Sequence, residues 1–125
     1  MIYLDTHAVW AMSRRETDRF SSRALRALEM NDDIRISPMV LLEIEFLHEI
    51  GRFKVSGERV LDVLAAEIGL RVCDTQFLLV ARQAIEERWT RDPFDRIIVA
   101  HARIHGATLI TLDTRIHKHY SQALA

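Results

Sequence analysis

The stretch DPFDRIIVAHARIHGATLITLD, residues 92–113, joins a helix pattern to a strand pattern. Asp92 and Pro93 begin a helix, because aspartate caps free backbone N–H groups and proline fits the first turn. This helix ends near Gly106, and Thr108 to Leu112 then forms a short apolar run typical of a buried strand. A helix that leads directly into a buried strand indicates an α/β protein.

The rest of the chain repeats this alternation. Three more short apolar runs are predicted as strands: Ile2–Leu4, Ile34–Ile36 and Leu70–Cys73. Helical patterns fill the intervals, over residues 7–14, 21–30, 38–50, 58–68 and 75–88. The tail after Asp113 has room for a helical turn and a small edge strand near Tyr120. Strands separated by helices predict right-handed βαβ units and a mainly parallel sheet of four to five strands.

Length and composition limit the classes of protein that are possible. A chain of 125 residues, 49% hydrophobic and 28% charged, is expected to form a single globular domain over residues 1–125. Its net charge of −1 argues against a constitutively basic nucleic-acid-binding domain, but not against an enzyme that acts on nucleic acid. One cysteine excludes an intramolecular disulfide. Without a long apolar run or a signal-peptide pattern, we expect a soluble, cytoplasmic protein with no membrane partner.

Two aspartates follow predicted strands directly. Asp5 comes after Ile2–Leu4, and Asp113 comes after the strand that ends at Leu112. Because parallel strands end at the same edge of a sheet, both carboxylates are expected at that edge, where α/β proteins place their functional crevice. Each aspartate alone is equally well explained as a turn residue or a helix cap.

Glu43 lies within an apolar pattern of the helix predicted at residues 38–50. Helical spacing places it on one face with four apolar residues: Met39, Phe46, Leu47 and Ile50. Glu45, His48 and Glu49 fall on the opposite face, which we expect to be solvated. Since a buried charge needs a partner, Glu43 is predicted to bind a metal ion or to pair with an arginine.

Asp95 is the fourth candidate carboxylate. It shares a helix face with Ile98, Val99 and Ala102 and is therefore expected to point toward the sheet. An alternative role is a favourable interaction with the helix dipole in the first turn. Asp92 is already explained as the helix cap, so the chemical role is assigned to Asp95.

Four carboxylates at one edge would repel one another unless a cation neutralised them. Oxygen ligands without cysteine suit Mg²⁺ or Mn²⁺, and Mg²⁺ bound by few carboxylates points to phosphoryl chemistry. Thr6 and Thr111 adjoin these acids and are candidates to hydrogen-bond a metal-bound water or a phosphate.

Several segments together resemble one known family. They are Leu4-Asp5-Thr6-His7, Ser37 with Glu43-Ile44, Arg91 to Ala100, and Leu109-Ile110-Thr111-Leu112-Asp113. These segments resemble the PIN domain, most closely the VapC-type toxins of bacterial toxin–antitoxin pairs. Asp-Pro-Phe-Asp-Arg and Thr-x-Asp are the most specific of the motifs.

The resemblance implies more than the spacing does. It implies a Rossmann-like α/β/α sandwich and a Mg²⁺- or Mn²⁺-dependent endoribonuclease that cleaves tRNA, rRNA or mRNA. It also implies a homodimer, and a heterotetramer or larger assembly with a cognate VapB-type antitoxin. The implied acidic quartet is Asp5, Glu43, Asp95 and Asp113. Asp5 and Asp95 would be the direct metal ligands, and the other two would act through waters or a second ion.

Other functions remain open on the sequence. A haloacid-dehalogenase-like phosphatase would use Asp5 as its nucleophile, but it usually has an aspartate two residues later, where this chain has His7. A non-catalytic interaction module would use the acids for a structural cation.

Histidines and aromatic residues outside the quartet have simpler interpretations. His101 and His105 have the spacing of a zinc-binding pair, but a mixed surface helix explains them better. Trp89 is expected to pack a helix end, with base stacking as the alternative. The basic tail that includes Arg115, Lys118 and His119 is interpreted as a solvated terminus, with RNA contact as the alternative.

Overall fold

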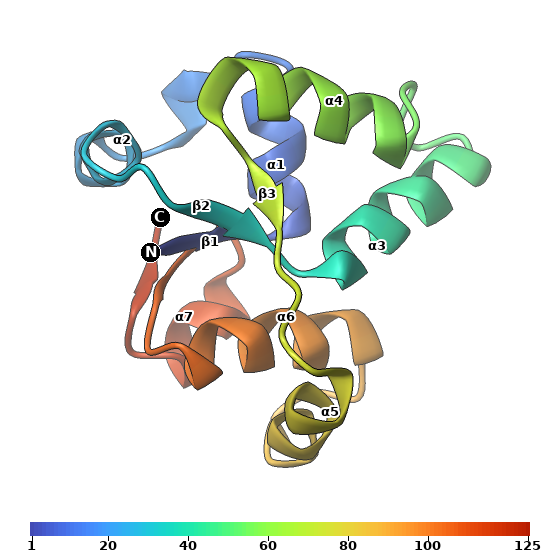
Figure 1. The fold of residues 1–125 in the computed structure, drawn as a ribbon, viewed down its shortest axis with the longest axis vertical. Helices are drawn as coiled ribbons and strands as arrows, with labels where there is room; N and C mark the ends of the chain where they lie inside the picture. Colours follow the sequence, from blue (N-terminus) through green and yellow to red (C-terminus); the bar gives the residue numbers. More distant parts are fainter.

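In the computed structural model, which describes residues 1–125, five short strands form one parallel sheet. Their order across the sheet is β3-β2-β1-β4-β5 (Figure 1). The strands are β1 (Ile2–Leu4), β2 (Ile34–Ile36), β3 (Arg71–Val72), β4 (Thr108–Ile110) and β5 (Ala123–Leu124). The expected parallel sheet is therefore confirmed, with the last edge strand three residues beyond Tyr120.

The helices lie close to their predicted positions. They are α1 (Thr6–Ser13), α2 (Ser22–Glu29), α3 (Pro38–Glu49), α4 (Gly57–Ile68), α5 (Phe77–Ile85), α6 (Pro93–Ile104) and α7 (Thr114–His119). A short 3₁₀ turn at Thr17–Arg19 was not expected. The helix predicted at residues 75–88 is shorter at both ends, since α5 spans Phe77–Ile85. Thr75 and Glu87 lie outside it, and their side chains form hydrogen bonds with His105 and Trp89.

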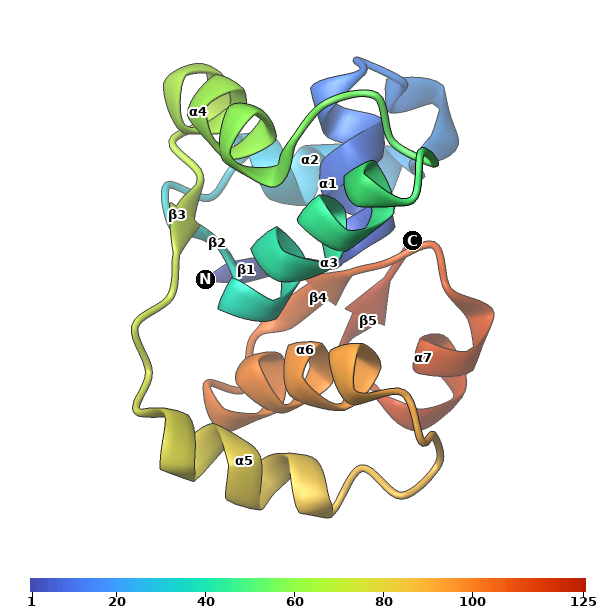
Figure 2. The same cartoon turned by 90° about the vertical axis from the view of Figure 1, so that its right-hand side faces the viewer.

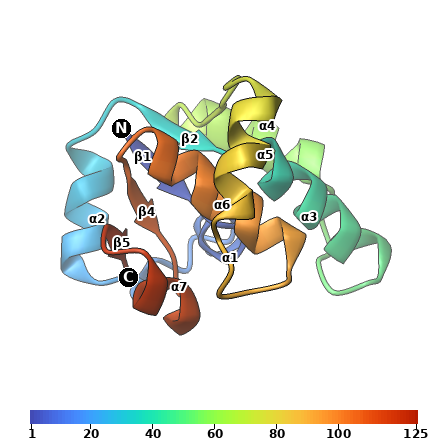
Figure 3. The same cartoon turned by 90° about the horizontal axis from the view of Figure 1, so that it is seen from below.

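Helices cover both faces of the sheet. Figure 2 shows α1, α2 and α4 on one side and α5, α6 and α7 on the other. The view from below in Figure 3 shows α5 alongside α6, against which it packs. Helix α3 contacts α1, α4 and α6 and so bridges the two layers at one end of the sheet. This arrangement is the expected α/β/α sandwich.

Helix α6 is buried more deeply than expected. His101 is only 2% exposed, and its ring stacks on Tyr3 of β1 with 6.3 Å between the ring centroids. Burial lowers the pKa of His101, so the imidazole is neutral at pH 7. The interpretation of α6 as a mixed surface helix was therefore wrong at His101. Tyr3 points toward α6 because successive side chains of a strand alternate between the two faces.

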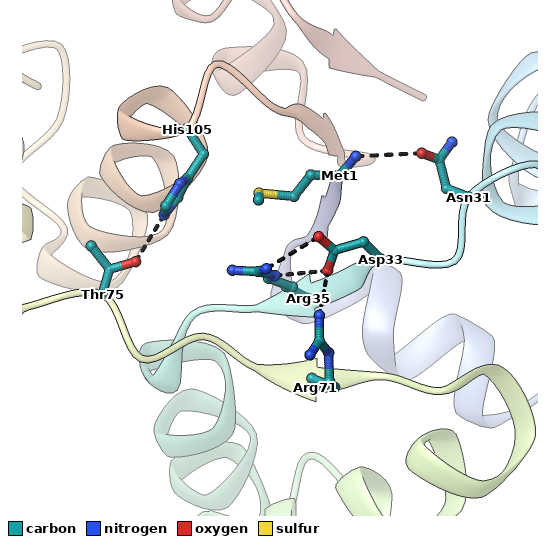
Figure 4. A network of polar contacts seen from close by, with 7 residues as sticks. All are labelled: Met1, Asn31, Asp33, Arg35, Arg71, Thr75 and His105. Carbon is teal, nitrogen blue, oxygen red and sulfur yellow. Dashed lines mark hydrogen bonds and ion pairs between the residues drawn. The ribbon is translucent and has the colours of Figure 1, made fainter.

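Polar side-chain contacts join β2 and β3 at one edge of the sheet. Asp33 accepts hydrogen bonds from Arg35 at 2.7 Å and from Arg71 at 2.8 Å, which link the two strands (Figure 4). These two guanidinium groups lower the pKa of Asp33 to about 2. On the neighbouring segment, Thr75 forms a hydrogen bond with His105 at 2.8 Å.

No helix in the structure is both long enough and apolar enough to cross a bilayer.

Candidate active site

A polar cavity of about 260 Å³ lies at the carboxyl ends of β1 and β4. Its lining comprises Asp5, Thr6, His7, Glu43, Asp92, Asp95, Ile98, Asp113 and Arg115. The structure thus brings all four predicted carboxylates together, from the segments that follow β1 and β4 and from helices α3 and α6. It also adds a fifth carboxylate, Asp92, together with His7 and Arg115. The sequence motif explains Asp92 fully as a helix cap, so it gives no sign that the Asp92 carboxylate also lines the cavity.

Asp5 is held by two hydrogen bonds at the end of β1. Its Oδ1 accepts the N–H of Ala8 at 2.8 Å, which caps α1, and its Oδ2 accepts the hydroxyl of Thr111. The side chain is almost completely buried. Burial raises the pKa of Asp5, while the hydrogen bonds from Thr111 and Ala8 act in the opposite direction. The carboxylate is therefore fixed in orientation before any ligand binds.

Asp113 has a corresponding position at the end of β4. Its Oδ1 accepts the N–H of Arg115 at 2.8 Å and caps α7, while its own N–H donates to the hydroxyl of Thr111 at 3.0 Å. Both strand-end aspartates are therefore helix caps and cavity residues at once. The two interpretations that the sequence left open are compatible, because each cap uses a single carboxylate oxygen.

The buried face of α3 is not the one predicted. Val40, Ile44 and Leu47 are buried, whereas Phe46 and Ile50 are 46% and 52% exposed. The core-facing stripe is rotated by one residue, about 100° around the helix, because α3 packs against α1, α4 and α6 simultaneously. Glu43 lies at the margin of this stripe, half-buried, and not in the middle of an apolar face.

Glu43 still faces the cavity. It accepts a hydrogen bond from the hydroxyl of Thr6, and no arginine pairs with it. Burial raises its pKa, with further contributions from Asp92 and Asp5. The alternative of a buried ion pair is thereby excluded in this structure.

Two residues expected to be solvated on the far side of α3 are bonded instead. Glu45 accepts the N–H of Gly57 at 3.0 Å, and Nδ1 of His48 lies 2.9 Å from the carbonyl oxygen of Phe53. Both side chains are half-buried, and they tie α3 to the connection that leads into α4. Glu49 is exposed as expected.

The capping role predicted for Asp92 at the start of α6 is confirmed, whereas the chemical role assigned to Asp95 stays a prediction. Asp92 accepts the N–H of Phe94 at 2.8 Å and caps the helix. Asp95 is half-buried, and no hydrogen bond to its carboxylate is formed. Burial raises the pKa of Asp95 to about 7, and repulsion from Asp92, Glu43, Asp113 and Asp5 adds to the shift. Burial and the neighbouring negative charges therefore act in the same direction on the pKa of Asp95.

The donor set fits a hard divalent cation. No three histidine, cysteine, aspartate or glutamate side chains converge into a ready-made cage. Mg²⁺ does not require one, since it keeps several waters and binds through one or two carboxylates. Five carboxylates without a neutralising arginine ion pair provide the oxygen ligands and the negative charge that such an ion prefers.

Two threonines, Thr6 and Thr111, hold carboxylates of the cavity. Thr6 and Thr111 do not direct their hydroxyl hydrogens into the cavity; they donate them to Glu43 and Asp5. They orient these two carboxylates; the second oxygen of Glu43 accepts no hydrogen bond, whereas both oxygens of Asp5 accept one.

A family model for the PIN domain matches residues 2–121 of this chain. The chain belongs to the PIN-domain family. Among curated proteins, this PIN domain is 29% identical to Ribonuclease VapC22 of Mycobacterium tuberculosis over 123 residues, which cover 94% of this chain and 91% of that protein.

Solved structures share the fold of this PIN domain. One is VapBC2 from Rickettsia felis bound to a promoter DNA fragment, with a TM-score of 0.69, 21% identity, and coverage of 100% of this chain and 98% of that chain. Another is a toxin–antitoxin complex from Klebsiella pneumoniae, with a TM-score of 0.70, 18% identity, and coverage of 100% and 97%. These likenesses support the same α/β/α architecture over the whole chain.

Proposed function

We propose that this PIN domain is a Mg²⁺- or Mn²⁺-dependent endoribonuclease and the toxin of a VapBC-type toxin–antitoxin pair. The observation that carries the proposal is the convergence of Asp5, Glu43, Asp92, Asp95 and Asp113 on one cavity at the carboxyl ends of parallel strands. The similarity to a protein named Ribonuclease VapC22 supports the choice of RNA as the substrate.

Four of the five carboxylates have a proposed role in metal binding. Asp5 and Asp95 bind the divalent ion directly, and Glu43 and Asp113 complete the site through waters or a second ion. When bound, the ion supplies an activated water and neutralises charge on the phosphate that is cleaved. Asp5 presents its carboxylate in one orientation because Ala8 and Thr111 hold both oxygens.

Glu43 and Asp95 contribute differently from Asp5. Thr6 donates to one oxygen of Glu43, and Glu43 lines the cavity with its other oxygen free of hydrogen bonds. Asp95 has no hydrogen bond to satisfy its charge, and burial together with the neighbouring carboxylates raises its pKa and so disfavours its ionised form. A cation relieves this penalty and releases the proton, so ligand binding and ionisation of Asp95 favour each other.

The proposed partners follow from the toxin–antitoxin complexes that share the fold. We infer that a cognate VapB-type antitoxin neutralises this chain. We further infer that two copies form a homodimer, which builds a heterotetramer or a larger assembly with the antitoxin.

Cleavage of total cellular RNA tests the activity. We expect the purified protein to cleave RNA with Mg²⁺ or Mn²⁺ and to lose that activity with EDTA. Asp5→Asn and Asp95→Asn should abolish cleavage, while Asp62→Asn, an exposed aspartate of α4, should leave it unchanged. Expression of the wild type should arrest growth, and the two site variants should relieve the arrest.

Two other outcomes would reject the proposal. Metal binding that depends on Asp5, without RNA cleavage by the wild type, would indicate the non-catalytic interaction module. Trapping of a phosphoryl group on Asp5 with a phosphate-monoester substrate would indicate the phosphatase.

A further inference from the structure

One cation lines the carboxylate cavity without pairing to any carboxylate. Arg115 belongs to α7 and is exposed, and its backbone N–H donates to the capping carboxylate of Asp113. Its guanidinium makes no ion pair; instead it lies over the ring of Trp89, with 5.7 Å between the guanidinium carbon and the ring centroid. An arginine beside five carboxylates is thus held on an aromatic face.

Trp89 is itself fixed, although it lies in a loop between α5 and α6. Its ring stacks on His119, with 5.0 Å between centroids and an angle of 6° between the planes. Its Nε1–H donates to Glu87 at 2.7 Å. Glu87 is only 3% exposed and forms an ion pair with Arg103 at 2.6 Å, and Arg103 also donates to the carbonyl oxygen of His119 at 3.0 Å. The cluster of Arg115, Trp89 and His119 is therefore held by the buried carboxylate of Glu87 and its ion pair with the partly exposed Arg103.

The position of Arg115 leaves its hydrogen-bond donors free. The N–H groups of a guanidinium match phosphate oxygens in pairs, and stacking on an indole fixes the plane of the group without using them. Once a divalent ion compensates the carboxylates, Arg115 is the positive side chain at the cavity that is available to an incoming anion.

We propose that Arg115, held over Trp89, binds a backbone phosphate of single-stranded RNA next to the phosphate that is cleaved. Arg115 is then a substrate-binding residue, and Trp89 positions it. This inference rests on the proposed ribonuclease function.

RNA binding as a function of salt tests the role of Arg115. All variants keep Asp5 and are measured with Mg²⁺ present, so that the divalent ion still binds; the RNA carries phosphorothioate linkages, which slow cleavage and keep the backbone charge. The fluorescence anisotropy of a labelled single-stranded RNA gives the dissociation constant between 50 and 500 mM KCl. Loss of one phosphate contact in Arg115→Ala should reduce the slope of log affinity against log salt by about 0.7, which corresponds to about fivefold weaker binding at 0.1 M. Arg26→Ala, an exposed arginine of α2 without an ion pair, should change neither quantity.

The role of Trp89 is tested separately from charge. Trp89→Leu removes the aromatic face and should weaken binding severalfold while the salt slope stays the same, because all charges remain. Trp89→Phe restores an aromatic face for the guanidinium and should recover most of the affinity. Equal affinity for the leucine variant and the parent would overturn the positioning role.

The outcomes for this inference and for the ribonuclease function are distinguishable. If the wild type cleaves RNA but Arg115→Ala binds RNA with unchanged affinity and slope, the inference is wrong and the function stands. If the wild type cleaves no RNA with Mg²⁺ or Mn²⁺, the proposed function fails, and the role of Arg115 fails with it.

Discussion

Asp5 caps a helix and lines the cavity with one carboxylate. Its Oδ1 caps α1, and its Oδ2 accepts a hydrogen bond from the Thr111 hydroxyl. The buried carboxylate is therefore held in one orientation. Asp92 and Asp113 also combine both positions: they cap α6 and α7 and line the same cavity. At this scale a capping motif is no argument against a functional role, since the helix N-terminus also favours negative charge.

Thr111 is predicted to control the orientation of Asp5. Thr111→Val keeps the shape but leaves Asp5 without its hydroxyl donor and the N–H of Asp113 without its acceptor. We expect a loss of about 1–3 kcal/mol in the free energy of unfolding and weaker binding of Mn²⁺. Urea denaturation and a metal titration measure the two effects. Thr108→Val, a half-buried threonine of β4 with no side-chain hydrogen bond, is the control and should cost little.

Asp95 is predicted to make the metal-free protein less stable at high pH. Its pKa is about 7 in the folded state against an ordinary value of 3.8, so the folded state holds the proton more tightly than the unfolded chain. This stabilisation is complete below pH 3.8 and is lost as the pH rises through about 7.

Urea denaturation in EDTA at several pH values measures this effect. Asp95→Asn should raise stability at pH 8 by about 1–2 kcal/mol, less than for a fully buried group because solvent screens the carboxyl. It should also flatten the dependence between pH 4 and 7. An equally steep dependence in the variant would contradict the assignment to Asp95.

At the scale of elements, α3 connects the carboxylate cavity to α4. Glu43 on one side of α3 faces the cavity, while Glu45 accepts the N–H of Gly57 at the first residue of α4. The two helices approach closely there. A Cβ atom on Gly57 would lie 2.6 Å from the carbonyl oxygen of Leu41. A glycine is therefore needed for contact between backbones, not for an unusual φ angle.

Gly57→Ala is predicted to push α4 away from α3. The overlap is with a backbone atom, which cannot rotate away, so we expect a destabilisation of about 1–3 kcal/mol. Thermal and urea denaturation measure it. Ser22→Ala, at the exposed first residue of α2, is the matched control, for which alanine should be neutral or slightly stabilising. A neutral effect of Gly57→Ala would show that the two helices can separate without cost.

At the scale of the whole molecule, the strand order brings the carboxylates together. β1 and β4 are neighbours in the sheet although about 100 residues separate them in the chain. Asp5 and Asp113 therefore emerge side by side, and α3 and α6 pack against each other to add Glu43 and Asp95. The fold concentrates negative charge that the unfolded chain keeps apart.

A divalent ion is predicted to stabilise the whole fold. An ion that binds the folded state alone adds about 2.7 kcal/mol to the free energy of unfolding at 100 times its dissociation constant. We expect Mn²⁺ to raise the melting temperature of the wild type at pH 8, and to do so less at pH 5.5, where protons compete at Asp95. Asp5→Asn should lose most of this increase, and Asp62→Asn should keep it. An identical increase in all three proteins would indicate binding elsewhere.

The homodimer stays a prediction at this scale. Large apolar side chains of α5 are about half exposed or more: Phe77, Leu78, Leu79 and Ile85. Sedimentation of the purified chain across a range of concentrations measures its mass. A monomer at all concentrations would contradict this part of the proposal.

The sequence by itself determined the local structure. Helix caps, proline at helix starts and short apolar runs act within a few residues of the chain, so the strands and most helix ends were predictable from them. The strand-end positions of Asp5 and Asp113 followed from the same local signals, and the motifs around Asp92–Ala100 indicated the PIN domain.

Only the tertiary structure decided how those elements face one another. Three helices, α1, α4 and α6, contact α3 and set which of its sides is buried. The apolar periodicity of the sequence predicted a buried side that differs from the observed one by one residue. Asp92 joins the cavity, His101 is buried against Tyr3, and Arg115 rests on Trp89 because segments distant in sequence pack together. Local propensity cannot specify such contacts, since their energy exists only once the distant partner is in place.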